Sequence, residues 1–124
     1  MTSHFSGAYT ALVTPFRDGK VDETAFVSVI ERQIVSGIHG LVPNGTTGEA
    51  PTLSVEEQKR VISLCVETAK GRVRVVAGTG SNDTAHSVHL TEQAHELHVD
   101  GFLVVTPYYN KPPPRGIVAH FQAI

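Results

Sequence analysis

The sequence predicts an α/β fold of parallel (β/α) units that forms the first half of a TIM (β/α)8 barrel. Apolar segments centred near residues 10, 40, 75 and 103 recur with helical patterns between them, a spacing typical of right-handed parallel β/α units. The segments are apolar throughout, as strands buried on both faces are. Unusual residues follow each segment, so they would converge at the carboxyl end of the sheet, where barrels build their sites. An open doubly wound sheet is the alternative architecture.

Domain organisation follows from the length. A complete barrel needs about 250 residues, whereas the chain has 124. We therefore expect residues 1–124 to be a truncated N-terminal half-barrel that reaches the fourth strand and the start of the fourth helix, without a second domain. The chain ends without a change in composition, which favours truncation over a domain boundary.

The first unit begins with a strand expected at residues 8–13 and ended by Thr14 and Pro15, followed by a turn at Asp18–Gly19. Asp22 is the expected N-cap of a helix that ends at Gly37. Apolar residues at helical spacing predict its buried face. They are Phe26, Val29, Ile30, Ile34 and Val35.

The second unit begins with a strand at residues 38–42. Ser54 and Glu57 have the spacing of a capping box, which predicts a helix over residues 55–70. Its buried face is predicted to hold Val61, Ile62, Cys65, Val66 and Ala69. Cys65 is the only cysteine, and its place on this apolar stripe favours a small buried thiol over a nucleophile.

The third and fourth units repeat the pattern. A strand is expected at residues 73–77, and Asn82 or Asp83 caps a helix that runs to about His98. The fourth strand is expected at residues 102–105, and a fourth helix starts after the proline run that ends at Pro114.

The loop between the second strand and its helix is the first candidate for chemistry. Thr46 and Thr47 are adjacent hydroxyls flanked by Gly45 and Gly48. Glycines allow positive φ and close approach of a ligand, so both hydroxyls could face a small molecule. The alternative is a simple turn that joins strand to helix, because Gly and Thr are common turn residues.

The loop after the fourth strand is the second candidate. Tyr108 and Tyr109 lie between Pro107 and the run Pro112–Pro114, and prolines stiffen a loop. A phenol beside a threonine hydroxyl can pass a proton along a hydrogen-bonded chain. Alternatively the two rings pack at a surface or a subunit contact, where tyrosine is enriched. Both interpretations can hold together.

Two further patterns point only weakly to a ligand. Gly78-Thr79-Gly80 suggests a phosphate nest, but Asp83 stands where a dinucleotide fingerprint needs its third glycine. Four histidines form two staggered i, i+3 pairs on the third helix without cysteines or an acidic cluster beside them, which favours a solvated helix face over a metal site. They are His86, His89, His95 and His98.

Composition excludes several classes of protein. Apolar residues make up 40% and charged residues 18%, as in globular proteins, and the net charge is −2. No basic cluster is present to bind nucleic acid. The apolar runs reach only about six residues, too few to span a membrane. Residues 1–6 lack the pattern of a signal peptide, so we expect a cytoplasmic protein.

Two motifs, in order and at the right separation, resemble the dihydrodipicolinate synthase family. They are GTTGE at residues 45–49 and TPYYNKP at residues 106–112, and the match from residue 7 to 124 includes ALVTPF, AGTGSN and HFQAI. The resemblance implies a (β/α)8 barrel, usually a homotetramer. It also implies a Schiff-base lyase of diaminopimelate and lysine synthesis that condenses pyruvate with aspartate semialdehyde, without metal or organic cofactor.

The resemblance also implies roles for single residues. Thr46 and Tyr109 match a proton relay, in which the tyrosine reaches into the neighbouring subunit's site. Thr47 matches the residue that binds the pyruvate carboxylate, and Tyr108 lies beside Tyr109 at the same subunit contact.

The family's Schiff-base lysine, a second relay tyrosine and a substrate-binding arginine fall beyond Ile124. The four lysines of the chain match none of these positions; they are Lys20, Lys59, Lys70 and Lys111. We therefore expect the 124-residue chain alone to be inactive, and poorly folded because an unclosed barrel exposes sheet edges.

Two other functions stay open. One is a pyruvate-dependent sugar-acid aldolase of the N-acetylneuraminate lyase or 2-keto-3-deoxygluconate type, which shares the barrel and a GTTGE-like loop but usually not YYNKP. The other is a non-catalytic half-barrel that pairs with another chain or binds a small anion. For the family's lysine feedback site, Asn82 matches but Ala50, Gln58 and His86 depart. We therefore expect weak or absent inhibition by lysine.

Overall fold

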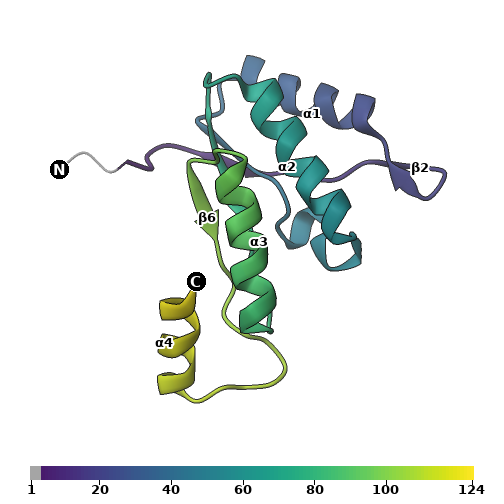
Figure 1. Cartoon of the computed structure of the whole chain (residues 1–124). Coiled ribbons are helices and arrows are strands. Elements are labelled where there is room, and N and C mark those ends of the chain that lie inside the picture. Colours follow the sequence, from purple (N-terminus) through teal and green to yellow (C-terminus); the bar gives the residue numbers. More distant parts are fainter. Residues whose placement is uncertain (1–3) are drawn as a thin grey trace.

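The computed structural model describes residues 4–124 and contains a four-stranded parallel sheet in the order β1-β4-β5-β6 (Figure 1). The strands are β1 at Tyr9–Ala11, β4 at Gly40–Val42, β5 at Arg74–Gly78 and β6 at Gly101–Leu103. Helices α1 at Glu23–Val35, α2 at Val55–Ala69 and α3 at Thr84–Glu96 connect them, and α4 at Pro114–Ala123 follows β6.

The order of the strands in the sheet decides between the two predicted architectures. Strands that are consecutive along the main sheet are neighbours in space, and each pair is parallel, as in the register Leu41↔Val75 between β4 and β5. A doubly wound sheet reverses its order at a switch point, and this sheet does not. The parallel β/α units therefore form the first half of a (β/α)8 barrel, as predicted.

Side-chain caps begin the first three helices where the sequence predicts. The Ala25 N–H donates to Asp22 at 3.0 Å, and Ser54 and Glu57 form the complete capping box that opens α2. For α3 the cap is Asp83 and not Asn82, because the His86 N–H donates to the Asp83 carboxylate at 3.1 Å. Each such cap stabilises its helix by about 1 kcal/mol.

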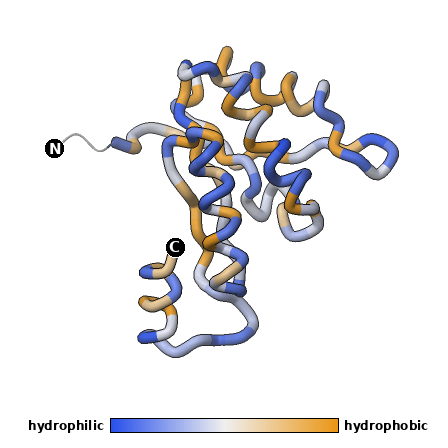
Figure 2. Tube along the Cα trace, in the orientation of Figure 1, coloured by the Kyte–Doolittle hydropathy of each residue, from blue (hydrophilic) through white to orange (hydrophobic). Residues whose placement is uncertain are grey.

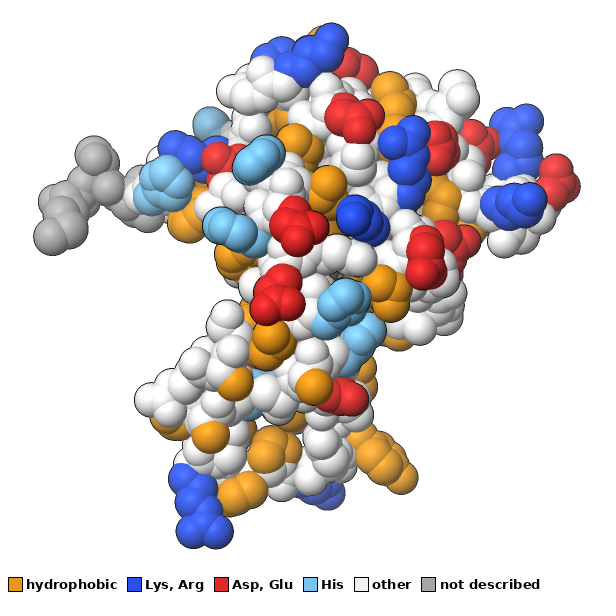
Figure 3. Space-filling model, viewed as in Figure 1, with side chains coloured by type: hydrophobic (Ala, Val, Ile, Leu, Met, Phe, Trp, Pro, Cys, Tyr) orange, Lys and Arg blue, Asp and Glu red, His pale blue; other side chains and the backbone are white. Residues whose placement is uncertain are grey.

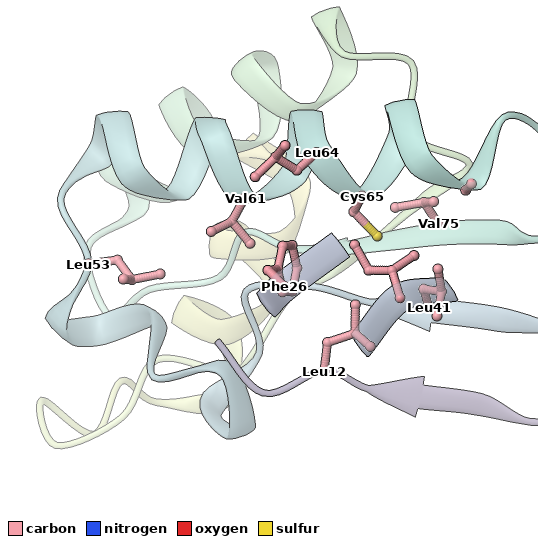
Figure 4. Packing of buried hydrophobic residues seen from close by; sticks show 10 residues of the cluster. Leu12, Phe26, Leu41, Leu53, Val61, Leu64, Cys65 and Val75 are labelled. Carbon is pink, nitrogen blue, oxygen red and sulfur yellow. The ribbon is translucent and has the colours of Figure 1, made fainter. Parts of the chain in front are cut away.

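The core lies between the sheet and helices α1 and α2 (Figure 4). Phe26 and Ile30 from α1 meet strand residues and one face of α2, including Cys65, which is fully buried. The full set is Leu12, Phe26, Ile30, Leu41, Leu53, Val61, Leu64, Cys65, Ala69 and Val75. The interpretation of Cys65 as a small buried thiol is confirmed.

Burial also makes Cys65 unreactive, because it raises the pKa of the thiol to about 12. The thiolate fraction at mildly alkaline pH then falls roughly 1,000-fold below that of a free cysteine. We expect Cys65 to resist alkylation once these residues are joined to the rest of a barrel, and mass spectrometry of the Cys65 peptide with and without denaturant measures it. Rapid alkylation without denaturant would show that α2 does not pack on the sheet as described.

A short hairpin before α1 is missing from the prediction, which placed only its turn. Strand β2 at Phe16–Arg17 pairs antiparallel with β3 at Lys20–Val21, and Figure 1 shows the hairpin projecting away from the main sheet. Asp18 and Gly19 both have positive φ, as a two-residue hairpin turn requires. Strands of two residues are too short to show an alternating pattern.

Two expectations about burial are wrong. Val35 is 83% exposed, because it lies five residues beyond buried Ile30 and is rotated by about 140° from it around the helix. In β6, Phe102 and Leu103 are 39% and 53% exposed, although the strand is hydrophobic (Figure 2). Phe102 and Leu103 are successive residues of a strand and point to opposite faces of the sheet, so among the described residues neither face is fully covered at β6.

Within residues 4–124, every helix is too short or too polar to cross a lipid bilayer.

Candidate active site

A cavity of about 710 Å³ opens where the carboxyl ends of β4, β5 and β6 meet. Its lining combines the loop after β4, the start of α2, the loop after β5 and the segment after β6. The lining includes Asn44, Gly45, Thr46, Ala50, Leu53, Gln58, Gly78, Gly80, Ser81, His86, Leu90, Leu103, Val105 and Tyr108. Of the four strand-end segments predicted to converge, those after β4, β5 and β6 line this cavity, and the Thr14–Pro15 segment after β1 does not.

The loop that carries the two threonines is more ordered than a simple turn. Thr46–Gly48 form a 3₁₀ turn, η1, and Ala50–Thr52 form a second, η2. Positive φ occurs at Asn44 and Glu49 and not at the two glycines, so the prediction that Gly45 and Gly48 supply positive φ is wrong. Asparagine is among the residues that best tolerate this conformation, and its short amide can bond locally.

Gly48 is needed for close approach and not for its φ. A Cβ at this position would lie 3.0 Å from the Leu12 carbonyl oxygen, which is tighter than ordinary contact. Thr14, just after β1, donates its buried hydroxyl to the Gly48 carbonyl at 2.7 Å. The end of β1 therefore holds the centre of the loop that carries the two threonines.

The two threonines occupy different places. Both side chains are exposed, but Thr46 lines the cavity and Thr47 does not. Among residues 4–124, neither hydroxyl makes a hydrogen bond to the protein, so both are free for a ligand. Thr46 lines the same cavity as Ser81 and His86, which follow β5, and Tyr108, which follows β6.

The two tyrosines are separated in the same way. Tyr108 lines the cavity and is half-exposed, whereas Tyr109 is 92% exposed, has a φ of 69° and does not line the cavity. Asn82 donates its amide to the Tyr108 carbonyl at 3.3 Å, and Asn110 donates to the Asn82 carbonyl at 3.0 Å. These two bonds fasten the tyrosine loop to the segment that precedes α3.

Steric packing accounts for the glycines of Gly78-Thr79-Gly80. A Cβ at Gly78 would collide with the Asn44 carbonyl, and one at Gly80 would collide with the backbone N of Val105. The hydroxyl of Thr79 is buried and accepts from Thr91 at 2.8 Å. The pattern thus lets neighbouring segments pass closely, and packing by itself accounts for both glycines.

The histidines do not share one environment, which corrects the expectation of a single solvated face. His86 lines the cavity and is half-buried, because it lies in the first turn of α3 beside the strand ends. His89 and His95 are exposed, and His98 lies beyond the end of α3. In the described part of the chain, no three His, Cys, Asp or Glu side chains gather in a group that could hold a metal ion.

Sequence reasoning did not assign a structural role to Asn44 and Gln58, two buried polar residues that line the cavity. Their side chains bond to backbone groups of neighbouring segments. The available signal was a polar residue between an apolar strand and a glycine, a position where Asn favours a turn.

The fold and cavity define a (β/α)-barrel protein whose candidate site lies at the carboxyl ends of its strands, with hydroxyl side chains and no lysine in the lining. The chain belongs to the dihydrodipicolinate synthetase family, whose sequence profile matches residues 4–124.

Individual relatives agree with this assignment. The 4-hydroxy-tetrahydrodipicolinate synthase of Parvibaculum lavamentivorans is 59% identical over 120 residues, covering 97% of this chain and 41% of that protein. The crystal structure of dihydrodipicolinate synthase from Aquifex aeolicus has a TM-score of 0.93 at 48% identity, over 97% of this chain and 42% of that one. A chloride-inhibited dihydrodipicolinate synthase from Acinetobacter baumannii complexed with pyruvate has a TM-score of 0.92 at 43% identity, over 94% and 40%. The chain thus spans about two fifths of the relatives it matches.

Proposed function

We propose that this chain supplies the threonine and tyrosine loops of a Schiff-base lyase that condenses pyruvate with aspartate semialdehyde. One observation carries the proposal: Thr46 and Tyr108, from two loops far apart in the sequence, line one cavity at the carboxyl ends of the strands. The family assignment and the pyruvate complex of the Acinetobacter relative support this substrate class.

The proposed chemistry assigns one task to each hydroxyl. By the family resemblance Thr47, which lies next to Thr46 but does not line the cavity of this chain, donates a hydrogen bond to the pyruvate carboxylate. Thr46 and Tyr109 relay the protons that leave and return as the imine of pyruvate becomes an enamine, which then attacks the aldehyde. Each hydroxyl can donate and accept at once, so the relay needs no metal or organic cofactor.

The amine that forms the imine lies outside this segment. All four lysines are exposed, and none lines the cavity, so none has the enclosed apolar surroundings that activate a lysine. They are Lys20, Lys59, Lys70 and Lys111.

The proposal includes an assembly and a location: the complete enzyme is a homotetramer in the cytoplasm. Tyr109 does not line the cavity of its own chain, so a catalytic role requires it to reach the site of a second subunit. Around α4 and the tyrosine loop, Figure 3 shows mostly uncharged and apolar side chains. Within α4, Val118 and Phe121 are exposed. Such a surface suits burial between subunits.

A chimera tests the function. Residues 1–124 are joined to the part of the Parvibaculum relative that follows the matched segment, and the product is assayed with a panel of substrates. We expect condensation of pyruvate with aspartate semialdehyde. Preferential cleavage of N-acetylneuraminate or 2-keto-3-deoxygluconate would instead favour a sugar-acid aldolase, and inactivity with every substrate would favour a non-catalytic role.

The 124-residue chain alone is expected to form no covalent adduct when pyruvate and borohydride are added, because the cavity contains no lysine. Intact-protein mass spectrometry measures the adduct, and the chimera is the positive control. An adduct on the isolated chain would contradict the assignment of the amine to another segment.

Lysine is expected to inhibit the chimera weakly, with half-inhibition above about 10 mM. Ala50, Gln58 and His86, which depart from the inhibited type, all line the cavity, and the Gln58 amide already donates to the Ala50 carbonyl at 3.1 Å. Initial rates over a range of lysine concentrations measure this. Strong inhibition near 1 mM would contradict the prediction.

A further inference from the structure

Asn44, the first residue of the loop that carries Thr46 and Thr47, is hydrogen-bonded to helix α2. Asn44 is 5% exposed and has a φ of 58°, and its amide nitrogen donates to the Gln58 carbonyl at 2.9 Å. This bond joins the end of β4 to the first turns of α2. It fixes the direction in which the chain enters Gly45 and Thr46.

The same residue of α2 also holds the far end of the loop. Gln58 is 8% exposed, and its side-chain nitrogen donates to the Ala50 carbonyl at 3.1 Å and lies 3.5 Å from the Leu53 carbonyl. Residues 44 and 50 are therefore both held by Gln58, one through its backbone and one through its side chain. We call these two bonds the Asn44–Gln58 brace.

The brace is not explained by stability alone. Within the described residues the Asn44 side-chain oxygen is buried without a hydrogen-bond partner, and an unpaired buried acceptor costs about 1–3 kcal/mol. Glycine would supply the positive φ at Asn44 without burying a polar group. What glycine lacks is the bond to α2, which restrains the residues just before Thr46.

The neighbours of Asn44 leave the loop few other conformations. The Asn44 carbonyl packs so closely on Gly78 of β5 that a Cβ there would collide with it. Thr14 holds the Gly48 carbonyl from the opposite side. Thr46 therefore lies between restrained points on both sides, although its own hydroxyl makes no hydrogen bond to the described chain.

We propose that Asn44 and Gln58 are positioning residues that hold the Thr46 hydroxyl in the geometry for proton transfer. This inference rests on the proposed function of Thr46. Proton transfer depends steeply on distance, and a displacement of about 1 Å can cost 100-fold in rate. A brace that acts at residues 44 and 50 controls such displacements without touching substrate.

The test uses the active chimera with Asn44→Gly, which keeps the backbone freedom for positive φ and removes only the amide. Gln58→Met is the second variant; it keeps the length and helix preference of the side chain and loses its two contacts to carbonyls. We expect kcat to fall about 10-fold in each. The fraction of subunits trapped as the pyruvate adduct by borohydride should stay unchanged, because trapping needs the lysine and not the relay.

The decisive measurement combines each variant with Thr46→Val. If the brace acts through Thr46, then Asn44→Gly or Gln58→Met changes kcat by less than about 2-fold once the Thr46 hydroxyl is absent. The proposal would be overturned if the fold-losses in kcat of the two single variants multiply in the double variant. It would also be overturned if a smaller fraction of trapped subunits accounts for the lower rate.

Thr91→Val is the matched control. It removes a buried α3 hydroxyl that donates to the Ser87 carbonyl and pairs with the Thr79 hydroxyl, both at 2.8 Å, and that takes part in neither bond of the brace. It should lower thermal stability by a similar amount while kcat changes less than about 2-fold. A chimera that is inactive before any substitution would refute the proposed function itself. An active chimera in which the effects of the brace variants and of Thr46→Val on kcat multiply would refute only the positioning role.

Discussion

Replacing Thr46 with valine is expected to lower the kcat of the chimera by about 100-fold, the lower end of the range for lost acid–base catalysis. Valine has nearly the same shape as threonine and lacks only the hydroxyl. Because Thr46 lines the cavity and its hydroxyl makes no hydrogen bond to the described chain, removing the hydroxyl breaks no internal bond. The loss should therefore appear in the rate and not in the stability.

Steady-state kinetics and thermal unfolding measure the two quantities separately. Thr52→Val is the matched control, because the Thr52 hydroxyl lies in the same connection but bonds only to the Glu49 carbonyl, at 3.0 Å on the surface. It should change kcat by less than about 2-fold. If Thr46→Val leaves kcat near that of the parent, the relay role of Thr46 is wrong.

Mixing two variants of low activity is expected to restore activity, which is the second large effect. Tyr109→Phe and Thr46→Val each remove one hydroxyl of the proposed relay. Tyr109 is 92% exposed and does not line its own cavity, so a site is expected to combine Thr46 of one subunit with Tyr109 of another. A mixed dimer then contains one intact site and one site that lacks both hydroxyls.

Random reassociation of equal amounts makes about half of the pairs mixed, so about a quarter of the sites should be intact. The measurement is activity after the two variants are dissociated, mixed and reassociated. The control mixes Thr46→Val with the double variant that carries both substitutions, and no mixed pair then has an intact site. A mixture with no activity above its components would show that Tyr109 does not act across subunits.

Local signals in the sequence were sufficient for the helices. Asp22 and Ser54 cap the helices that the sequence assigns to them, and Val61, Ile62, Cys65 and Ala69 are buried on α2 as their spacing predicts. These features depend on residues within one or two turns of each other, so a short window of sequence contains their cause. Val35 shows where this local reasoning fails. Each residue is rotated by about 100° from the one before it around the helix, so Val35 points to solvent although Ile34 beside it is partly buried.

The conformation of the threonine loop depends on partners far away in the sequence. Positive φ at Asn44 accompanies a bond to Gln58, and Gly48 accommodates the carbonyl of Leu12. Gln58 and Leu12 lie outside the loop, so the sequence of the loop does not reveal these contacts. From that sequence alone, the two glycines are the residues expected to adopt positive φ. The same holds for Gly78, where a side chain would collide with the Asn44 carbonyl in the loop after β4.

The sequence by itself determined the repeating β/α units, the helix caps, the buried face of α2 and the two loops that carry hydroxyls. Only the tertiary structure decided that Thr46 and Tyr108 share a cavity, that Thr47 and Tyr109 stay outside it, and that His86 joins the lining. The physical reason is the range of the interactions. Periodicity and capping act within a few residues, whereas the membership of a cavity depends on how strands distant in the sequence pack and where each loop is held.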